Sequence, residues 1–572
     1  GSAAFTQTRF NYYLAVIVAV GAAYFLQVAL DAIDLTSLAA LRDIEGWQVM
    51  TALAVVAVLI VPLVGVATPV WQAGNSSQPG SVTQWDGSLQ WMNDETPTPG
   101  ELEGADNPME LYGTYERPED GDFDYPEGAY GVQSWWDYGH WITTRAERIP
   151  NANPFQQNAG EAADYLLAPS EEEAREVLAS QSTEGEHTRY VMVDSQMASP
   201  NSKFNAPVTF YSGNETREDF NRVLYQQTEQ GGFRTVMQVN TQRYHESQMI
   251  RLYEHYGSAV EPQPVVVDWE TRTAQTQDGE QIEVSVIPQD RTRTVRQFDN
   301  MTAAREYVAE DGSAQVGGVG SLPSERVEAL EHHRLVHASQ ARGQSPSALQ
   351  VRVLRQLIPE GTSVEDLLGE SFLQAFQDDF VKTFERVPGA TIEGSGAEPG
   401  QEVQATVQMQ KSSGQTFEYT QYAEADSNGD FELTVPYSTT GYDEFGPENG
   451  YTNTSVRAAG PYQLSTGLVV DNGTPSARIG QVNVTEAQVV GADTDPATVE
   501  LEETTLGGSE TGDSDTTDTD SESADDSTGD TNTTGAINPP EAFAPGASSL
   551  ATRTAVIDTV ATSVTAPVSL GT

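Results

Sequence analysis

The chain opens with two long stretches that contain no charged side chain, Phe10 to Leu30 and Trp47 to Trp71. At about 1.5 Å per residue, a helix of either length crosses the ~30 Å hydrocarbon core of a bilayer, and tryptophan favours the interfaces. The pattern predicts that residues 1–71 form a membrane α-helical hairpin with spanning helices at 10–30 and 47–71. The connecting loop carries one basic residue, Arg42, among four acidic residues, so it does not fix the orientation.

Between residues 72 and 387 the hydrophobic pattern changes repeatedly between the helical and the strand period. Short runs with apolar residues three and four apart predict helices, one of them after a Ser170–Glu173 capping box, and short apolar runs predict buried strands. The pattern therefore predicts a mixed α/β domain over 72–387. The expected helices are Ser170–Ser180, Gln248–Gly257, Leu322–Val336 and Val364–Val387, and the expected strands are Arg189–Asp194 and Pro264–Trp269.

After Pro388 the apolar and polar residues alternate, which is typical of half-buried strands. Asn428-Gly429 predicts a tight hairpin turn between two of them. We therefore expect an antiparallel β-sandwich domain over 388–500. Residues 501–572 are rich in acidic residues, serine and threonine, and predict a disordered low-complexity tail.

Composition narrows the class of protein. The 572 residues include 84 Asp and Glu, 29 Lys and Arg, and no cysteine, for a formal net charge of -55. This excludes disulfides and cysteine chemistry, and it argues against nucleic acid as a partner. The only lysines are Lys203, Lys382 and Lys411. An acidic, lysine-poor surface favours a protein that works in concentrated salt, where charge repulsion is screened within about 3 Å; an acidic secreted stalk is the alternative.

The pentapeptide Trp135-Trp136-Asp137-Tyr138-Gly139 is the most informative motif. Indole N–H donors beside a carboxylate acceptor can together bind one hydroxyl group. The alternative is a hydrophobic anchor for a loop.

The segment from Trp135 to Gly160 resembles the signature of the catalytic subunit of archaeal oligosaccharyltransferases of the AglB type. Members of that family transfer a lipid-linked glycan to the asparagine of Asn-X-Ser/Thr. The resemblance implies that Trp135, Trp136 and Asp137 bind the hydroxyl of the Ser/Thr two residues after the acceptor asparagine. Tyr138 and Gly139 would then shape the turn.

Two more segments extend the resemblance. Asp194 and Met197 match an Asp-x-x-Met element that lies beside the same pocket, although Lys203 follows two residues later than in the usual pattern. Met197 would contact the threonine methyl group, or it would simply fill the core. Arg9, in an Arg-Phe context at the start of a spanning helix, would contact the donor diphosphate, or it would lie at the membrane interface.

The resemblance reaches about residue 490 and implies the C-terminal part of a multi-pass enzyme in the cell membrane with its soluble domain outside the cell. The implied partners are a dolichol-phosphate-type lipid-linked oligosaccharide, acceptor proteins and the bilayer. The implied cofactor is a divalent metal, Mn or Mg, whose ligands we expect upstream of Gly1. We expect a glycosyltransferase fragment that is inactive alone. The alternative is a non-enzymatic, membrane-anchored surface protein of a halophile.

Other signals are weaker. His332, His333 and His337 lie at metal-ligand spacing on an expected helix, but they lack an HExxH motif. Asp426, Asn428 and Asp430 favour a turn over a calcium loop, because Gly429 is at the fourth position of the segment and not the sixth. Seven Asn-X-Ser/Thr sequons suggest that the chain is itself a glycoprotein; they begin at Asn75, Asn214, Asn300, Asn453, Asn472, Asn483 and Asn532.

Overall fold

The computed structural model describes residues 82–99, 129–181, 187–229, 231–275, 281–343, 348–358, 363–368, 378–471 and 474–505, together with scattered helical positions between 20 and 54. Most of the two expected membrane segments lies outside these residues, as do Arg9 and the tail beyond residue 505. Among the described residues no helix has the length and apolar character needed to span a bilayer.

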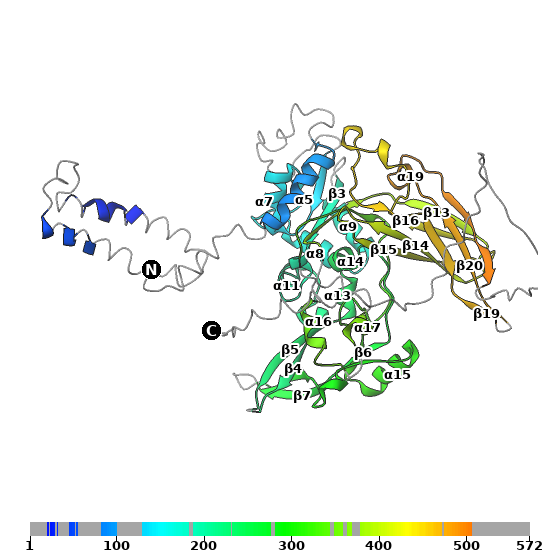
Figure 1. The fold of residues 1–572 in the computed structure, drawn as a ribbon, viewed down its shortest axis with the longest axis horizontal. Helices are drawn as coiled ribbons and strands as arrows, with labels where there is room; N and C mark the ends of the chain where they lie inside the picture. Colours follow the sequence, from blue (N-terminus) through cyan, green and yellow to red (C-terminus); the bar gives the residue numbers. More distant parts are fainter. Residues whose placement is uncertain are drawn as a thin grey trace, which may run out of the picture. The chain divides into compact units, whose positions relative to one another are not determined.

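A five-stranded sheet organises the mixed α/β part, in the order β11-β12-β3-β1-β2. Its central strand, β3, is labelled in Figure 1. Strand β1 pairs in parallel with β2 and β3, whereas β12 is antiparallel to β3 and β11. The strands are β1 (Tyr130–Gln133), β2 (Ile149–Pro150), β3 (His187–Asp194), β11 (His333–Ala338) and β12 (Val381–Arg386).

Helices cover both faces of this sheet. Val381 of β12 is paired with Asp194 of β3, and the Asp194 side chain is hydrogen-bonded to Trp85 of α5 (Val82–Glu95). The next residue of β12, Lys382, donates a hydrogen bond to the Tyr253 carbonyl of α14 (Gln248–Tyr253). Successive strand residues point to opposite faces, so α5 and α14 lie on opposite sides. The other helices of this part are α8 (Ala159–Leu167), α9 (Glu171–Gln181), α10 (Ser195–Ala198), α11 (Asn205–Phe210), α12 (Arg217–Phe220) and α13 (Gln242–Glu246).

Two smaller sheets, ordered β5-β4-β8-β7 and β10-β6-β9, have a second hydrophobic core. Their strands are β4 (Asn221–Gln227), β5 (Phe233–Asn240), β6 (Val265–Asp268), β7 (Glu270–Gln275), β8 (Gln281–Val286), β9 (Val295–Gln297) and β10 (Ala314–Val316). The accompanying helices are η5 (Arg291–Arg293), α15 (Met301–Asp311), α16 (Ala348–Leu354) and α17 (Val364–Leu368).

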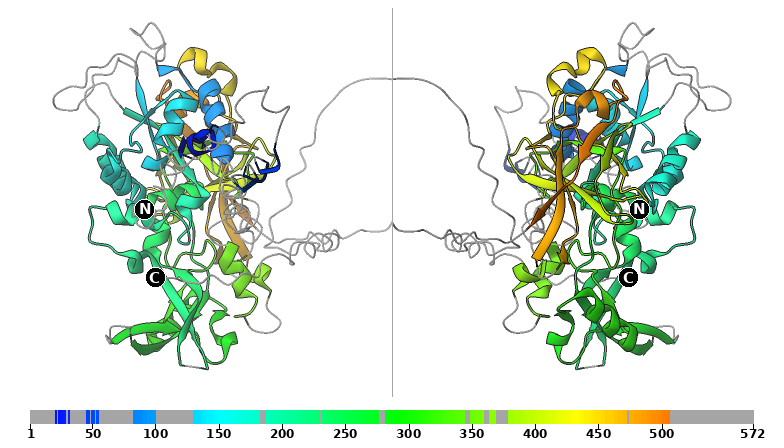
Figure 2. Two further views of the ribbon diagram at one scale, coloured as in Figure 1. Left: turned by 90° about the vertical axis from the view of Figure 1, so that its left-hand side faces the viewer. Right: turned by 90° about the vertical axis from the view of Figure 1, so that its right-hand side faces the viewer.

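The C-terminal part is built from a seven-stranded and a three-stranded sheet, and its long strands run alongside one another (Figure 2). It departs from a purely antiparallel arrangement, because β13 pairs in parallel with β21. The strands are β13 (Ala390–Ser395), β14 (Glu402–Gln410), β15 (Thr416–Glu424), β16 (Phe431–Val435), β17 (Arg457–Ala458), β18 (Tyr462–Thr466), β19 (Val469–Asp471), β20 (Thr474–Val482), β21 (Ala497–Glu500) and β22 (Glu502–Thr505). The short helices are η6 (Tyr442–Glu444), η7 (Pro447–Asn449) and α19 (Glu486–Val489).

Two details here differ from the sequence expectation. The tight turn at Asn428-Gly429 is present, with φ of 85° at Gly429, but it joins β15 and β16, which belong to different sheets and do not form a hairpin. Strand β22 pairs with β20 across the expected start of the tail, so the regular structure continues to Thr505.

Two expected long helices are wrong. Residues 322–332 form turns and loops, and residues 333–338 form β11. The segment from Val364 begins as the short helix α17, but residues 381–386 form β12. In contrast, the expected helix after Ser170 is α9, and the Glu173 backbone N–H donates to Ser170 Oγ at 3.2 Å, as the capping box predicted.

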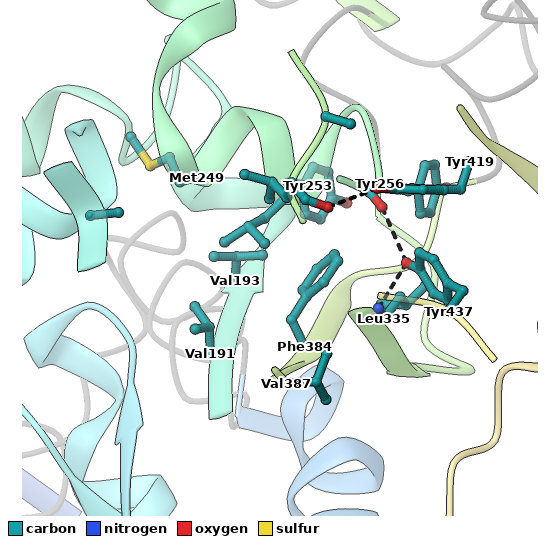
Figure 3. Close-up of a cluster of buried hydrophobic side chains, with 14 of the residues drawn as sticks. Val191, Val193, Met249, Tyr253, Tyr256, Leu335, Phe384, Val387, Tyr419 and Tyr437 are labelled. Carbon is teal, nitrogen blue, oxygen red and sulfur yellow. Dashed lines mark hydrogen bonds between the residues drawn. The ribbon is translucent and has the colours of Figure 1, made fainter. Parts of the chain in front are cut away.

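One large core joins the five-stranded sheet to the C-terminal sheets. Figure 3 shows Val191 and Val193 of β3 and Phe384 of β12 beside aromatic side chains of α14 and the C-terminal part. The Tyr437 hydroxyl accepts a bond from the Leu335 backbone N–H at 2.8 Å and donates to the Tyr256 carbonyl at 3.2 Å. Buried tyrosines thus satisfy backbone groups at this junction while adding apolar area.

Candidate functional site

The signature segment forms a sequence of short helical turns after β1. Trp135 is extended, η3 spans Trp136–Tyr138, α7 spans Gly139–Trp141, and η4, a π-helix, spans Ile142–Ala146. Gly139 approaches the Ala152 backbone so closely that a Cβ atom would overlap the Ala152 carbonyl oxygen. The motif therefore needs glycine for close packing, not for an unusual φ angle.

The signature places polar groups at a partly exposed edge. Lys203 Nζ lies 2.9 Å from Asp137 Oδ2 and 4.4 Å from the centre of the Tyr138 ring. The Asp137 side chain is 33% exposed and that of Lys203 is 30% exposed, so solvent reaches this pair. The neighbouring Trp136 Nε1 is buried and has no hydrogen-bond partner within the described residues.

Behind this edge lies a buried layer. Asp194, at the end of β3, caps α10: its Oδ1 accepts the Met197 backbone N–H at 2.8 Å. Its Oδ2 accepts the Trp85 indole N–H at 2.9 Å. Asp194, Met197, Trp135 and Tyr138 are all buried, so they shape the site from behind.

Trp85 is the residue that the sequence analysis missed. Its ring stacks on Tyr138 at 4.3 Å while its N–H holds Asp194, so one side chain of α5 contacts both motif segments. No pattern in the sequence indicates this role, because Trp85 and Asp194 are 109 residues apart.

Burial sets the protonation of the inner layer. It raises the pKa of Tyr138 well above its ordinary value, and the Asp194 carboxylate adds to that effect. Burial also raises the pKa of Asp194, while the bonds from Met197 and Trp85 oppose the shift. Tyr138 therefore stays neutral at physiological pH.

Arg148 fixes α5 against the signature. Its buried guanidinium donates to the carbonyls of Met92, Asn93 and Thr96 at the end of α5, at 3.0, 3.1 and 2.9 Å. It also donates to the carbonyls of Ala146 and Glu147, at the end of η4. A cation is favourable at helix C-termini, where carbonyls lack partners.

The described residues contain no group of three or more His, Asp or Glu side chains arranged to hold a metal ion. His332, His333 and His337 lie at the start of and along β11, not on a helix, and His333 Nδ1 is hydrogen-bonded to Glu171. These residues therefore do not fit the divalent metal implied by the resemblance, and we derive no step through it.

Comparison with known proteins matches two segments of the chain to family models. Residues 82–198 match the AglB core domain, and residues 389–494 match the archaeal glycosylation protein B long peripheral domain. The first match contains the whole cluster of Trp85, the signature, Asp194 and Met197.

Curated relatives extend the similarity. The chain is 49% identical over 521 residues to the dolichyl-monophosphooligosaccharide–protein glycotransferase AglB of Haloferax volcanii, covering 88% of this chain and 48% of that protein. It is 27% identical over 489 residues to dolichyl-phosphooligosaccharide-protein glycotransferase 3 of Archaeoglobus fulgidus, covering 81% of this chain and 49% of that protein. The chain thus spans about half the length of these relatives.

A solved structure, the A. fulgidus oligosaccharyltransferase tethered to an acceptor peptide with an NVT sequon, superposes with a TM-score of 0.49. It is 21% identical and covers 86% of this chain and 52% of that one, a likeness too distant to support an argument about function. The family assignment rests on the two domain matches and on the 49% identity. Residues 82–198 and 389–494 therefore belong to domain families of archaeal glycosylation protein B (AglB), and 88% of the chain is similar to AglB of H. volcanii.

Proposed function

We propose that this chain is part of an oligosaccharyltransferase catalytic subunit and that it recognises the Ser/Thr of the acceptor sequon. The complete enzyme transfers a lipid-linked oligosaccharide en bloc to the asparagine of Asn-X-Ser/Thr. The observation that carries the proposal is the Asp137–Lys203 pair at a partly exposed edge, next in the chain to Trp136, whose buried indole N–H has no partner among the described residues. The names of the curated relatives support the class of reaction.

The chemistry of a hydroxyl group fits this edge. A Ser/Thr hydroxyl donates one hydrogen bond and accepts up to two. In the proposed complex it donates to Asp137 and accepts from Trp136 Nε1, which gains the partner it lacks. Lys203 orients Asp137, because its ammonium donates a hydrogen bond to Asp137 Oδ2 at 2.9 Å.

The other expected site residues have supporting roles in this proposal. Trp135, Tyr138 and Gly139 form the packed turn, and Asp194 caps the helix α10 that carries Met197, which we assign to the threonine methyl group. Arg9 on the donor diphosphate remains part of the proposal, and so do Mn or Mg and ligands outside this sequence. The metal would supply polarisation of the acceptor amide and of the leaving diphosphate.

We also infer a cell-membrane location, with the soluble part outside the cell. In support, the described helical positions between 20 and 54 carry large exposed apolar side chains, including Tyr24 at 71% and Met50 at 67% exposure. Exposed apolar side chains of this kind suit a lipid environment. The acidic, lysine-poor composition supports adaptation to concentrated salt.

The test is Asp137→Ala in the full-length protein, with Asp86→Ala as the matched control. Asp86 also forms a surface ion pair, with Arg145, and its side chain is 34% exposed against 33% for Asp137. A charge-assisted hydrogen bond is worth about 1.5–3 kcal/mol, so we expect transfer to a sequon peptide to fall about 10- to 150-fold in Asp137→Ala and to be unchanged in Asp86→Ala.

Thermal unfolding of both variants separates recognition from folding. Asp137 is partly exposed, so we expect the folded state to survive its loss. Wild-type transfer by a folded Asp137→Ala protein would contradict the proposed role. The present chain alone is expected to be inactive, and glycan transfer by it would contradict that second expectation.

A further inference from the structure

A polar cavity lies at the opposite end of β3 from the signature. Its volume is about 600 Å³, and it is lined by α9, the start of β3, the end of β12 and the loop at Gly450 and Tyr451. His187 lines the cavity, and Asp194 lies seven residues further along the same strand. At ~3.3 Å per residue this separates the two places by roughly 23 Å, so the cavity is distinct from the proposed acceptor site.

The cavity is basic in a strongly acidic chain. Its lining includes three arginines, Arg175, Arg189 and Arg386, and three histidines, His187, His332 and His333. The whole chain has only 29 Lys and Arg and 7 His against 84 Asp and Glu. Basic side chains are therefore concentrated here.

The two carboxylates in the lining are already engaged. Glu385 accepts bonds from Arg189, Arg334 and Thr452 at 3.1, 2.8 and 2.6 Å. Glu171 accepts bonds from His333 Nδ1 and from the backbone N–H groups of Glu331 and His332. These bonds occupy both carboxylates, which leaves little capacity to neutralise a further cation in the cavity.

Of the three arginines that line the cavity, Arg386 is the one without a carboxylate partner among the described residues. It donates to the Thr188 carbonyl at 2.7 Å, and within the described residues it forms no salt bridge. Arg175 is 61% exposed and lies 3.6 Å from Glu172, a distance typical of a weak surface pair. The positive charge in the cavity also acts on His187. Burial lowers the pKa of His187, and the charges of Arg189 and Arg386 lower it further.

We propose that this cavity binds a small molecule carrying a carboxylate or phosphate group, with Arg386 and Arg175 as its anchors. The guanidinium fork matches both kinds of oxyanion in a bidentate manner. The volume lies within the ~300–1,000 Å³ typical of small-molecule sites, which is more than a single ion needs. The proposal does not depend on glycan transfer.

The experiment titrates the purified chain with glucuronate and with inorganic phosphate by calorimetry, replacing sodium chloride so that ionic strength stays constant. We expect saturable binding of at least one probe, and at least tenfold weaker binding in Arg386→Gln and in Arg175→Gln. Arg272→Gln is the matched control, because Arg272 forms a comparable surface pair with Glu270 on β7. It should bind as the wild type does.

The two probes identify the recognised group. Binding of glucuronate alone assigns a carboxylate, binding of phosphate alone assigns a phosphate, and either result supports the cavity. Phosphate also stabilises proteins by exclusion from their surface, but that effect is shared by all the variants. Absence of saturable binding for both probes, or wild-type binding by both folded cavity variants, would overturn the proposal without bearing on the acceptor site.

Discussion

The three lysines of this chain each lie within 3 Å of an aspartate. Lys203 pairs with Asp137 at 2.9 Å, Lys382 with Asp378 at 2.8 Å and Lys411 with Asp379 at 2.5 Å. The rarity of lysine is evident in the sequence, but two of these partners are 66 and 32 residues away along the chain. Composition could therefore single out Lys203 without indicating what it contacts.

Substitution of Trp85 tests how the buried layer supports the signature. Trp85→Phe keeps an aromatic ring against Tyr138 but removes the N–H that binds Asp194 Oδ2. A buried carboxylate that loses a donor costs about 1–3 kcal/mol. We expect the free energy of unfolding, measured by guanidinium denaturation in concentrated salt, to fall by that amount, with a larger relative loss of transfer activity in the full-length protein.

Trp91→Phe is the control on the same helix. Trp91 stacks on His337 at 4.5 Å, and no described residue pairs with its indole N–H. Its replacement should cost less stability and leave transfer unchanged. Equal effects of the two substitutions would show that ring size, not the bond to Asp194, matters in α5.

At the scale of elements, the strands β11 and β12 explain why two expected helices were wrong. All six residues of β11 are buried, so the strand lacks the alternation that reveals a half-exposed strand. Its polar residues resembled the solvent face of a helix, but Arg334 is paired inside the protein with Glu385 and Glu486. Partners 51 and 152 residues away cannot be read from local spacing. The α9 helix was predictable because its cap and its apolar face are local.

Arg148 is the residue on which the position of α5 depends. Arg148→Met removes every bond that the guanidinium donates to the ends of α5 and η4. The carbonyls of Met92 and Ala146 keep donors in Thr96 Oγ1 and Asn93 Nδ2, whereas those of Asn93, Thr96 and Glu147 lose the guanidinium. We expect a loss of more than about 3 kcal/mol in unfolding free energy, since each orphaned polar group costs about 1–3 kcal/mol. The unfolding free energy of Arg148→Lys should lie between those of Arg148→Met and the wild type, because an ammonium cannot reach all of these carbonyls.

Arg145→Met is the matched control for Arg148→Met. Arg145 lies in η4 and forms an ion pair with Asp86 that is 48% and 34% exposed. Exposed pairs contribute at most about 1 kcal/mol. If both variants unfolded at the same guanidinium concentration, the capping role of Arg148 would be wrong.

At the scale of the whole molecule, burial of histidine makes stability depend on pH. His245, His255, His333 and His337 are all buried, and burial lowers the pKa of each, to about 3 for His245 and His337. The unfolded chain binds these protons near pH 6.5, whereas the folded chain does not. Stability is therefore fully present above pH 6.5 and is lost as the pH falls from there toward 3.

Between pH 7.5 and 5.5, His245 and His337, whose pKa values are lowered to about 3, should each remove about 1.4 kcal/mol of unfolding free energy. Most carboxylates titrate below this window, so the loss is assigned to histidine. Guanidinium denaturation at both pH values should show that His337→Asn, which cannot take up a proton, reduces the pH dependence by that amount whatever its effect on stability at pH 7.5. A wild-type slope in His337→Asn would mean that His337 takes up its proton in the folded protein, against the burial that the fold imposes on it.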